Sequence, residues 1–178
     1  MTRAMSQKQL FAIGILHRVP LNWRPVNLLT PPKLYDELFS KLFKKKCPTC
    51  DRVPTNPFIC MHCGLQVCFD DCCKIMDPND RTFSLEVNRH AESCTGGTAV
   101  YLALNSAVIV IIKAKTGAVW GSIYLDAHGE EDRNLRRGKQ MFLSESRFRI
   151  LQSDFIAHSF DRVNSWYYTN MLANAALR

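Results

Sequence analysis

The sequence lacks any apolar run long enough to cross a membrane as a helix. Its longest such stretch, residues 99–112, has about 14 residues and includes Asn105 and Ser106, whereas a spanning helix requires about 20. No segment recurs at a fixed period, which excludes a repeat array. The apolar residues 10–16 are followed by His17 and Arg18 rather than by a small-residue cleavage site. We therefore expect a cytoplasmic protein with no membrane partner.

Glycine and proline are also scarce, with eight of each among 178 residues, while 47% of the residues are hydrophobic and 22% are charged. This composition is typical of a folded domain and excludes extended disorder. The net charge is +7, yet residues 47–100 carry four Lys and Arg against seven acids. A nucleic-acid module concentrates basic residues around its reading element. Because the cysteine-rich part is acidic, nucleic acid is not the expected partner.

The eight cysteines have the spacing of metal ligands rather than of a disulfide framework. The spaced pairs are Cys47-x2-Cys50, Cys60-x2-Cys63 and His90-x3-Cys94. Two thiolates three positions apart on a tight turn can face one ion, because the backbone N–H groups of the turn point at sulfur. Gly64 suits the left-handed residue that such a turn commonly needs. The sequence therefore predicts zinc as the cofactor.

Ten candidate ligands lie between residues 47 and 94, which is enough for two tetrahedral sites. We predict a first site from Cys60, Cys63, His90 and Cys94, the last two on one face of a short helix. The second site draws on Cys47 and Cys50. They are joined by two of Cys68, Cys72 and Cys73, since two adjacent cysteines can hardly both bind one ion without strain. His62, inside the knuckle turn, is expected to point to solvent.

Neither a RING nor a catalytic zinc centre fits this spacing. A RING, the cross-braced two-zinc module of ubiquitin ligases, needs a closing C-x2-C pair, and none follows Cys73. A thiolate-rich, fully occupied site leaves no open position for a reactive water. Residues 47–98 hold few large apolar side chains. We therefore expect the metal to fold this region, since structural zinc contributes about 10–16 kcal/mol of apparent binding energy.

The segments around the cysteines alternate between helical and strand patterns. Thr30 and Pro31 are typical of a helix start, and an apolar stripe at helical spacing follows from Leu34 to Phe43. Lys44, Lys45 and Lys46 close this helix, where cations oppose the negative end of its dipole.

Downstream, residues 98–112 predict a β-hairpin whose second strand is buried on both faces. Short strands are expected at 119–124 and 141–143. Ser144 is expected to cap a second long helix that runs to Ser165. We predict an α+β fold: a zinc-stabilised cysteine-rich region with a small antiparallel β-sheet flanked by two long helices.

Residues 126–132 crowd a histidine among carboxylates, which raises the possibility of a metal-dependent hydrolase. The candidate residues are Asp126, His128, Glu130 and Glu131. Arg133, Arg136 and Arg137 follow directly, so charge pairing explains the acids equally well. No partner cluster for catalysis occurs elsewhere in the sequence. We therefore predict no catalytic residue in this chain.

A family resemblance rests on several motifs together. Residues 124–132 read Tyr-Leu-Asp-Ala-His-Gly-Glu-Glu-Asp, and residues 135–139 read Leu-Arg-Arg-Gly-Lys. With the Cys60–Gly64 knuckle, Cys72-Cys73, His90-x3-Cys94 and the apolar hairpin, these resemble the C-terminal region of the UBR-type (N-recognin) E3 ubiquitin-protein ligases. The likeness is strongest toward the third-type branch, extends to the plant proteolysis-six branch, and runs from about residue 34 to 161.

The resemblance implies a cap-like domain of a very large ligase, with an autoinhibitory role proposed for such caps. Members of the family use a UBR box to read destabilising N-termini and a RING to recruit the ubiquitin-conjugating enzyme. Neither module occurs in this sequence, so the resemblance implies a non-catalytic regulatory domain of the N-degron pathway. Its partners would be the remainder of the ligase, with its RING and helical scaffold, and indirectly the conjugating enzyme. The Cys72-Cys73 pair adds both residues to the candidate zinc ligands.

We divide the chain into an N-terminal extension (1–29), a UBR-like C-terminal domain (30–165) and a tail (166–178). The domain contains the zinc region (47–94), the hairpin (98–112) and the C-terminal helix (144–165). The alternative function is a zinc-dependent nucleic-acid-binding module that uses the basic N-terminal segment. Phosphate contacts would make the affinity of such a module for nucleic acid fall steeply with salt concentration. This salt dependence distinguishes the nucleic-acid-binding function from that of a ligase domain.

Overall fold

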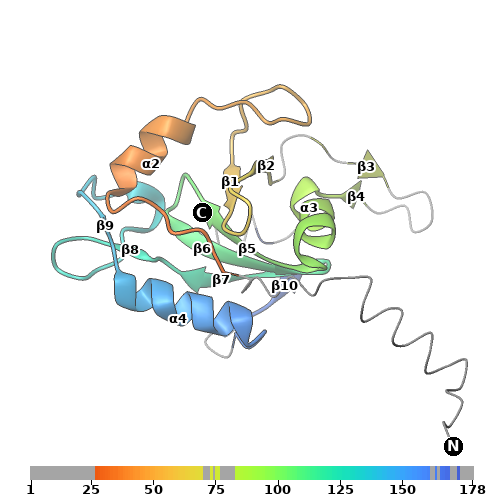
Figure 1. Cartoon of the computed structure of the whole chain (residues 1–178). Coiled ribbons are helices and arrows are strands. Elements are labelled where there is room, and N and C mark those ends of the chain that lie inside the picture. The colour runs from red at the N-terminus through yellow and green to blue at the C-terminus, as the bar shows by residue number, and fades with distance from the viewer. Residues whose placement is uncertain are drawn as a thin grey trace, which may run out of the picture.

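An antiparallel sheet of six strands, in the order β10-β7-β6-β5-β1-β2, forms the centre of the molecule (Figure 1). The computed structural model describes residues 27–69, 73, 75–76, 83–160, 163, 165–168 and 172. The strands of this sheet are β1 (Pro57–Cys60), β2 (Gln66–Cys68), β5 (Thr98–Ala103), β6 (Val108–Lys113), β7 (Thr116–Gly121) and β10 (Tyr167–Tyr168). Neighbouring strands pair in an antiparallel sense throughout.

The β5–β6 hairpin is buried on both faces, as the sequence predicted. Its register runs from the pair Thr98 and Lys113 to the pair Ala103 and Val108. Because side chains alternate along a strand, Ile109 and Ile111 enter one core while Val110 and Ile112 enter the other. The hairpin therefore serves two hydrophobic cores at once.

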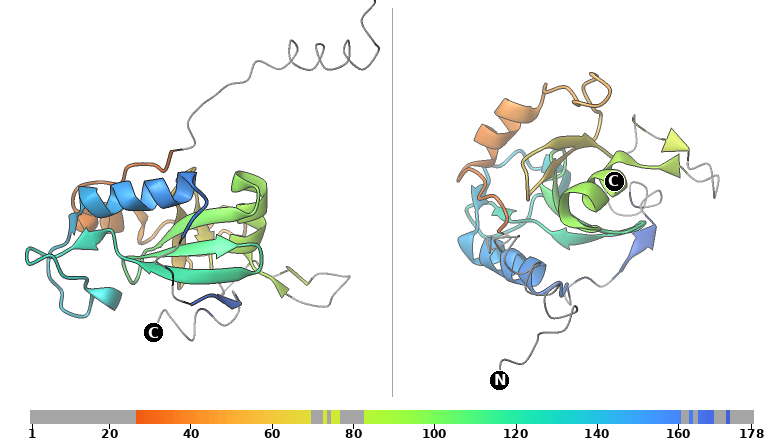
Figure 2. Two further views of the ribbon diagram at one scale, coloured as in Figure 1. Left: turned by 90° about the horizontal axis from the view of Figure 1, so that it is seen from below. Right: turned by 45° about the vertical axis from the view of Figure 1, so that its right-hand side comes forward.

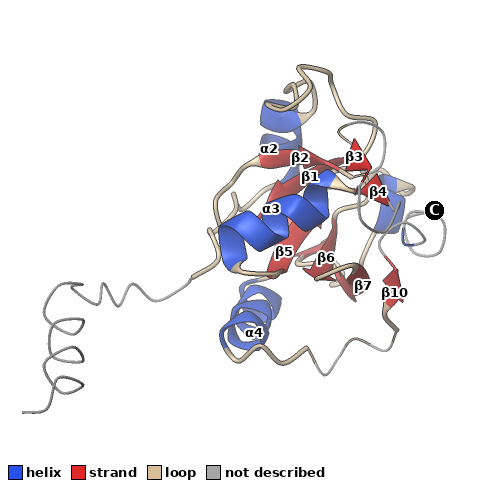
Figure 3. Ribbon diagram, turned by 90° about the vertical axis from the view of Figure 1, so that its right-hand side faces the viewer, coloured by secondary structure: helices blue, strands red, loops and turns tan. Residues whose placement is uncertain are grey.

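Helices cover both faces of the sheet. Helices α2 (Tyr35–Leu42) and α4 (Glu145–Ile156) contribute to the core that contains Ile109, and α3 (Glu86–Thr95) contributes to the core that contains Val110. Figure 3 shows α3 and α4 as separate helices at different sides of the sheet. The α+β class and the antiparallel sheet are thus confirmed. The two helices expected to be long correspond to α2, with 8 residues, and α4, with 12 residues, and both are shorter than predicted; α3 is the expected short helix.

Two short strand pairs flank the main sheet. Strand β3 (Ile75–Met76) pairs with β4 (Phe83–Ser84), and β8 (Tyr124–Leu125) pairs with β9 (Phe142–Leu143). The loop between β8 and β9 contains a short 3-10 helix, η1 (Arg133–Leu135), and projects from one end of the molecule (Figure 2). In the parts of the chain that are described, no helix is both long and apolar enough to pass through a bilayer.

The first predicted helix begins later than the sequence indicated. Thr30 does not cap it, because α2 begins only at Tyr35. The Tyr35 N–H donates to the Met141 carbonyl at 3.0 Å, and the Leu143 N–H donates to the Lys33 carbonyl at 2.8 Å. These bonds hold residues 33–35 in an extended conformation beside residues 141–143. Because these residues pair with a distant segment, the helix does not begin at Thr30 and Pro31.

The last predicted helix is shorter than expected. Ser144 caps it as predicted, since its hydroxyl accepts from the Arg147 N–H. The helix ends at Ile156 rather than at Ser165, and His158 takes a left-handed φ of 51°. The Ser159 N–H donates back to the Asp154 carbonyl at 3.0 Å, which closes the helix and turns the chain away.

The segment after residue 165 is not simply a frayed tail. Strand β10 adds an edge to β7, and the buried side chain of Leu172 joins the core that contains Val110. A Cβ at Gly117 would lie 3.0 Å from Leu172 Cδ2, so the absence of a side chain there lets Leu172 approach the sheet. A residue in the expected tail therefore completes one of the cores.

The carboxylates of the β8–β9 loop are occupied by structural partners. Only 1% of the Asp126 side chain is exposed, and it accepts the N–H groups of His128 and Glu130, each at 2.9 Å. Lys139 Nζ lies 3.2 Å from the same carboxylate. These donors, the Glu130 N–H foremost, lower the pKa of Asp126 to about 2. The network favours the charge-pairing interpretation of this acidic segment over the hydrolase one.

Glu131 and Asp132 extend this network. Glu131 pairs with Arg147 at the start of α4 and with Arg133 at 2.9 Å. Asp132 accepts the Arg137 N–H at 2.9 Å. The loop is thus held to α4 and to itself by ionic hydrogen bonds.

Replacing Asp126 by Asn is expected to lower the melting temperature, because the amide loses the attraction of Lys139 and a strong acceptor for two N–H groups. A carboxyl whose pKa is lowered by folding stabilises the fold above its unfolded pKa of about 4 and loses this contribution as the pH falls through its folded pKa. The difference in melting temperature between wild type and Asp126→Asn should therefore be constant from neutral pH to about pH 5 and narrow below about pH 4.

Differential scanning fluorimetry of both proteins at each pH measures this difference. Protonation of the cysteine and histidine side chains acts on both proteins, so the comparison uses only the pH values at which both still melt cooperatively. A difference that stays constant down to about pH 3 would contradict the assignment of the stabilisation to the Asp126 carboxylate.

Candidate metal centres

The first cluster, which we call the knuckle site, consists of Cys60, Cys63, His90 and Cys94. Their ligand atoms all lie within 4.8 Å of one another. Cys60 ends β1, and the chain turns directly afterwards: the Gly64 N–H donates to the Cys60 carbonyl at 2.8 Å, and the Cys60 N–H donates to the Leu65 carbonyl at 2.9 Å. Gly64 has a φ of 75°, and a Cβ there would lie 3.2 Å from Leu29 Cδ1. The turn therefore needs glycine at this position.

Helix α3 supplies the other half of the knuckle site. His90 and Cys94 are four residues apart on this helix, and His90 Nε2 lies 3.4 Å from Cys63 Sγ. The helix is held against the sheet by the buried Val87 and by Tyr101, whose hydroxyl donates to the Val87 carbonyl at 2.8 Å. The expected helix with His-x3-Cys on one face is confirmed.

Burial sets the electrostatics of the knuckle site. It raises the pKa of Cys60 to about 12, although the N–H groups of Cys63 and His62 act in the opposite direction. Burial also raises the pKa of Cys94 and lowers that of His90. A lowered pKa keeps the imidazole neutral, which is the form that binds a metal. Thiolates are costly here without a cation, and N–H donors that face sulfur are already in place.

The second cluster, the four-cysteine site, consists of Cys47, Cys50, Cys68 and Cys73, with ligand atoms again within 4.8 Å of one another. The Asp51 N–H donates to the Cys47 carbonyl at 2.9 Å, and Asp51 takes a left-handed φ of 54°, which closes the first turn. Cys68 ends β2. Cys68 and Cys73 thus join Cys47 and Cys50 in this cluster. Cys72 lies outside the described residues.

Glu86, which sequence reasoning did not single out, lies beside the four-cysteine site. It is the first residue of α3, with only 6% of its surface exposed. Its carboxylate accepts the Cys68 N–H at 3.2 Å and the Thr49 hydroxyl, and the Cys47 thiol lies 3.4 Å away. Burial alone would raise the pKa of Glu86, but these donors outweigh it and lower the pKa. Glu86 thereby connects the turn that carries Cys47 and the end of β2 to the start of α3.

The spacing of the ligand atoms fits tetrahedral zinc. With Zn–S of about 2.3 Å and Zn–N of about 2.0–2.1 Å, tetrahedral angles require about 3.8 Å between two sulfurs and about 3.5 Å between sulfur and nitrogen. Cys47 Sγ lies 3.8 Å from Cys73 Sγ, and Cys63 Sγ lies 3.4 Å from His90 Nε2. Both donor sets, four thiols and three thiols with one imidazole, are those of structural zinc sites.

Two other predicted features fall outside these clusters. His62 does not point freely to solvent: its ring lies 6.4 Å from that of Phe155, and its Nδ1 is buried without a partner among the described residues. The lysine run lies after the end of α2 at Leu42, whose last turn carries Lys41 instead. Lys46 pairs with Asp51 at 2.9 Å, and the Lys45 carbonyl accepts from Gln66.

Glu86→Ala is expected to lower the free energy of unfolding by about 2 kcal/mol, because it removes a buried, charged acceptor of the Cys68 N–H and the Thr49 hydroxyl. Urea unfolding followed by circular dichroism, with zinc in excess, measures the change. Glu92→Ala is the matched control, since Glu92 lies exposed on the same helix. Equal losses in the two variants would show that Glu86 does not organise the cysteine turns.

Comparison with known proteins identifies relatives of this chain. Residues 4–157 match the family described as Proteolysis_6 C-terminal. The chain is 40% identical over 143 residues to mouse E3 ubiquitin-protein ligase UBR3, which covers 80% of this chain and 7% of that protein. It is 36% identical over 148 residues to Drosophila melanogaster E3 ubiquitin-protein ligase Ubr3, which covers 82% of this chain and 6% of that protein.

The similarity extends to plants. The chain is 33% identical over 142 residues to Arabidopsis thaliana E3 ubiquitin-protein ligase PRT6, and this match covers 78% of the chain and 6% of that protein. The chain thus spans only about 6–7% of the length of the curated relatives it matches. The matched region includes the knuckle site, the four-cysteine site and the β8–β9 loop. This chain therefore belongs to the Proteolysis_6 C-terminal family, the C-terminal region shared with UBR-type E3 ubiquitin-protein ligases.

Proposed function

We propose that this chain is a zinc-binding structural and regulatory domain of a UBR-type E3 ubiquitin-protein ligase that acts in ubiquitin-dependent protein degradation. One observation carries the proposal: two separate sets of four ligand atoms each lie within 4.8 Å. Each set draws ligands from segments far apart in the sequence, such as Cys63 and His90. An ion at the knuckle site would therefore cross-link the knuckle turn to α3, and an ion at the four-cysteine site would cross-link the Cys47–Cys50 turn to the end of β2 and to Cys73.

The same donor sets argue for a role in binding rather than in chemistry. Four protein ligands saturate a tetrahedral ion and leave no position for a reactive water. The carboxylates of the β8–β9 loop form ion pairs with Lys139, Arg137 and Arg147. We therefore assign to the chain no catalytic residue. Its partners would be the remainder of a ligase polypeptide, with RING and helical scaffold, and through it a ubiquitin-conjugating enzyme in the cytoplasm.

The metal content of the purified chain tests the two sites. Inductively coupled plasma mass spectrometry is expected to find about two equivalents of zinc, and Cys63→Ser and Cys47→Ser should each lose about one and lower the melting temperature. Cys68→Ser should behave like Cys47→Ser. Glu92→Ala serves as the control and should retain both ions, because Glu92 is exposed on α3 and belongs to neither ligand set. Cooperative folding without zinc would refute the proposal.

A discharge assay tests the absence of chemistry. A conjugating enzyme charged with ubiquitin is mixed with the zinc-loaded chain, and loss of the thioester is followed on non-reducing gels. We expect the rate to equal that without the chain, whereas a RING-containing ligase fragment in a parallel reaction accelerates it. Faster discharge by the chain alone, abolished by Cys63→Ser, would overturn the assignment as a non-catalytic domain.

A further inference from the structure

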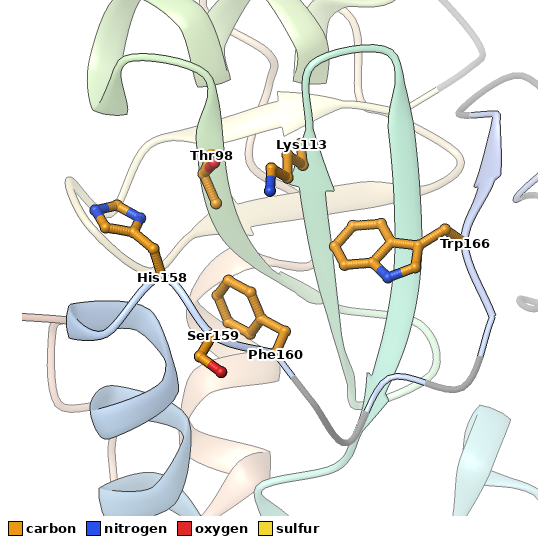
Figure 4. A pocket seen from close by; sticks show the side chains of 6 residues that line it. All are labelled: Thr98, Lys113, His158, Ser159, Phe160 and Trp166. Carbon is orange, nitrogen blue, oxygen red and sulfur yellow. The ribbon is translucent and has the colours of Figure 1, made fainter.

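A surface pocket of about 570 Å³ lies apart from both cysteine sites (Figure 4). None of its lining residues belongs to either site; they are Thr98, Lys113, His158, Ser159, Phe160 and Trp166. The pocket forms where the sheet ends, between the first residue of β5, the last residue of β6 and the segment that follows α4. Its volume is within the range of about 300–1,000 Å³ typical of ligand sites.

The geometry of the sheet brings Thr98 and Lys113 to the same side of this pocket. They are register partners in the β5–β6 hairpin, so their side chains leave the sheet on one face. Figure 4 shows the Lys113 side chain directed toward the space between Thr98 and Phe160. His158 stands at the rim, where its backbone takes a left-handed φ of 51°. The polar side of the pocket therefore consists of an ammonium, a hydroxyl and an imidazole, each of which can donate a hydrogen bond.

The charge of the pocket is uncompensated within the described part of the chain. No carboxylate is among the residues that line it. Elsewhere the chain pairs its cations closely, as Lys139 with Asp126 and Arg147 with Glu131 show. A lysine directed into an aromatic pocket without an acid therefore favours a negatively charged ligand.

The opposite wall is apolar. Phe160 is 9% exposed and forms the inner wall, while the ring of Trp166, 40% exposed, closes the far side and points inward. Free phosphate or a bare carboxylate would leave this aromatic surface unused. A peptide that carries an acidic side chain next to an aromatic one would pair with Lys113 and stack between the rings.

We propose that this pocket binds an acidic peptide segment in which a carboxylate adjoins an aromatic side chain. Lys113 and Thr98 hold the carboxylate, His158 donates from the rim, and Phe160 and Trp166 hold the apolar side chain. The site gives the domain a recognition surface that does not include the metal ligands. The proposal requires no zinc chemistry and can fail or succeed independently of the zinc assignment.

Fluorescence anisotropy of a labelled short peptide with Glu on both sides of Phe tests the proposal on the full zinc-loaded chain. Wild type should bind it, and the same peptide with Gln in place of Glu should bind at least about tenfold more weakly, a difference of about 1.4 kcal/mol. Lys113→Glu and Trp166→Ala should each weaken binding by a similar factor. Lys115→Glu, the same charge change two residues away and outside the pocket, should leave the affinity within about twofold of wild type.

The metal content of each variant is measured in the same experiment. If Lys113→Glu keeps the zinc content of wild type but loses peptide binding, the result supports peptide binding at the pocket. This conclusion does not depend on whether the zinc proposal is correct. Equal weakening by Lys113→Glu and Lys115→Glu would reduce the binding to general attraction by a basic chain and overturn the proposal. Absence of binding to wild type, equal binding of the Glu and Gln peptides, or displacement of the peptide by inorganic phosphate alone would also overturn it.

Discussion

The burial of the β5–β6 hairpin on both faces is the constraint on which the remaining structure depends. A strand pair with apolar side chains above and below must be covered twice, and α2 and α4 cover one face while α3 covers the other. Strand β1 then joins β5 and carries Cys60 at its end, so the position of the knuckle turn follows from the pairing of Cys60 with Tyr101. The same hairpin ends in Thr98 and Lys113, which fixes the polar side of the pocket. One apolar element thus positions a cysteine turn, a helix and a surface pocket.

The cysteine sites join the parts of the chain that the apolar cores hold least. Residues 47–56 form no helix or strand, and Cys47 is nevertheless fully buried. Its neighbours are other cysteines and Glu86 rather than large apolar side chains. Glu86 and His90 lie one turn apart on α3, so a single helix contacts both sites. Displacement of α3 would therefore disturb both ligand sets, which gives this short helix a larger structural role than its length suggests.

Features encoded locally were predictable from the sequence. The hairpin, the His-x3-Cys helix and the grouping of residues 60, 63, 90 and 94 all follow from periodicity or spacing within short segments. Features that depend on partners distant in the sequence were not predictable. Thr30 carries a helix-start signal, but pairing of residues 33–35 with residues 141–143 delays the helix. The end of α4 at Ile156 depends on a left-handed His158, which composition does not indicate. Glu86 was missed because its partners, Thr49 and Cys68, are separated from it by 37 and 18 residues.

The knuckle turn and the pocket share one packed neighbour. The ring of Phe155 lies 6.4 Å from that of His62 in the turn and 6.3 Å from that of His158 at the pocket rim. Phe155 is itself buried at the last turn of α4, where close packing leaves little room to absorb a shift. His62 in the knuckle turn and His158 at the pocket rim therefore both pack near one buried ring. The candidate ligand turn and the pocket share no lining residue, yet both depend on the position that α4 gives to Phe155.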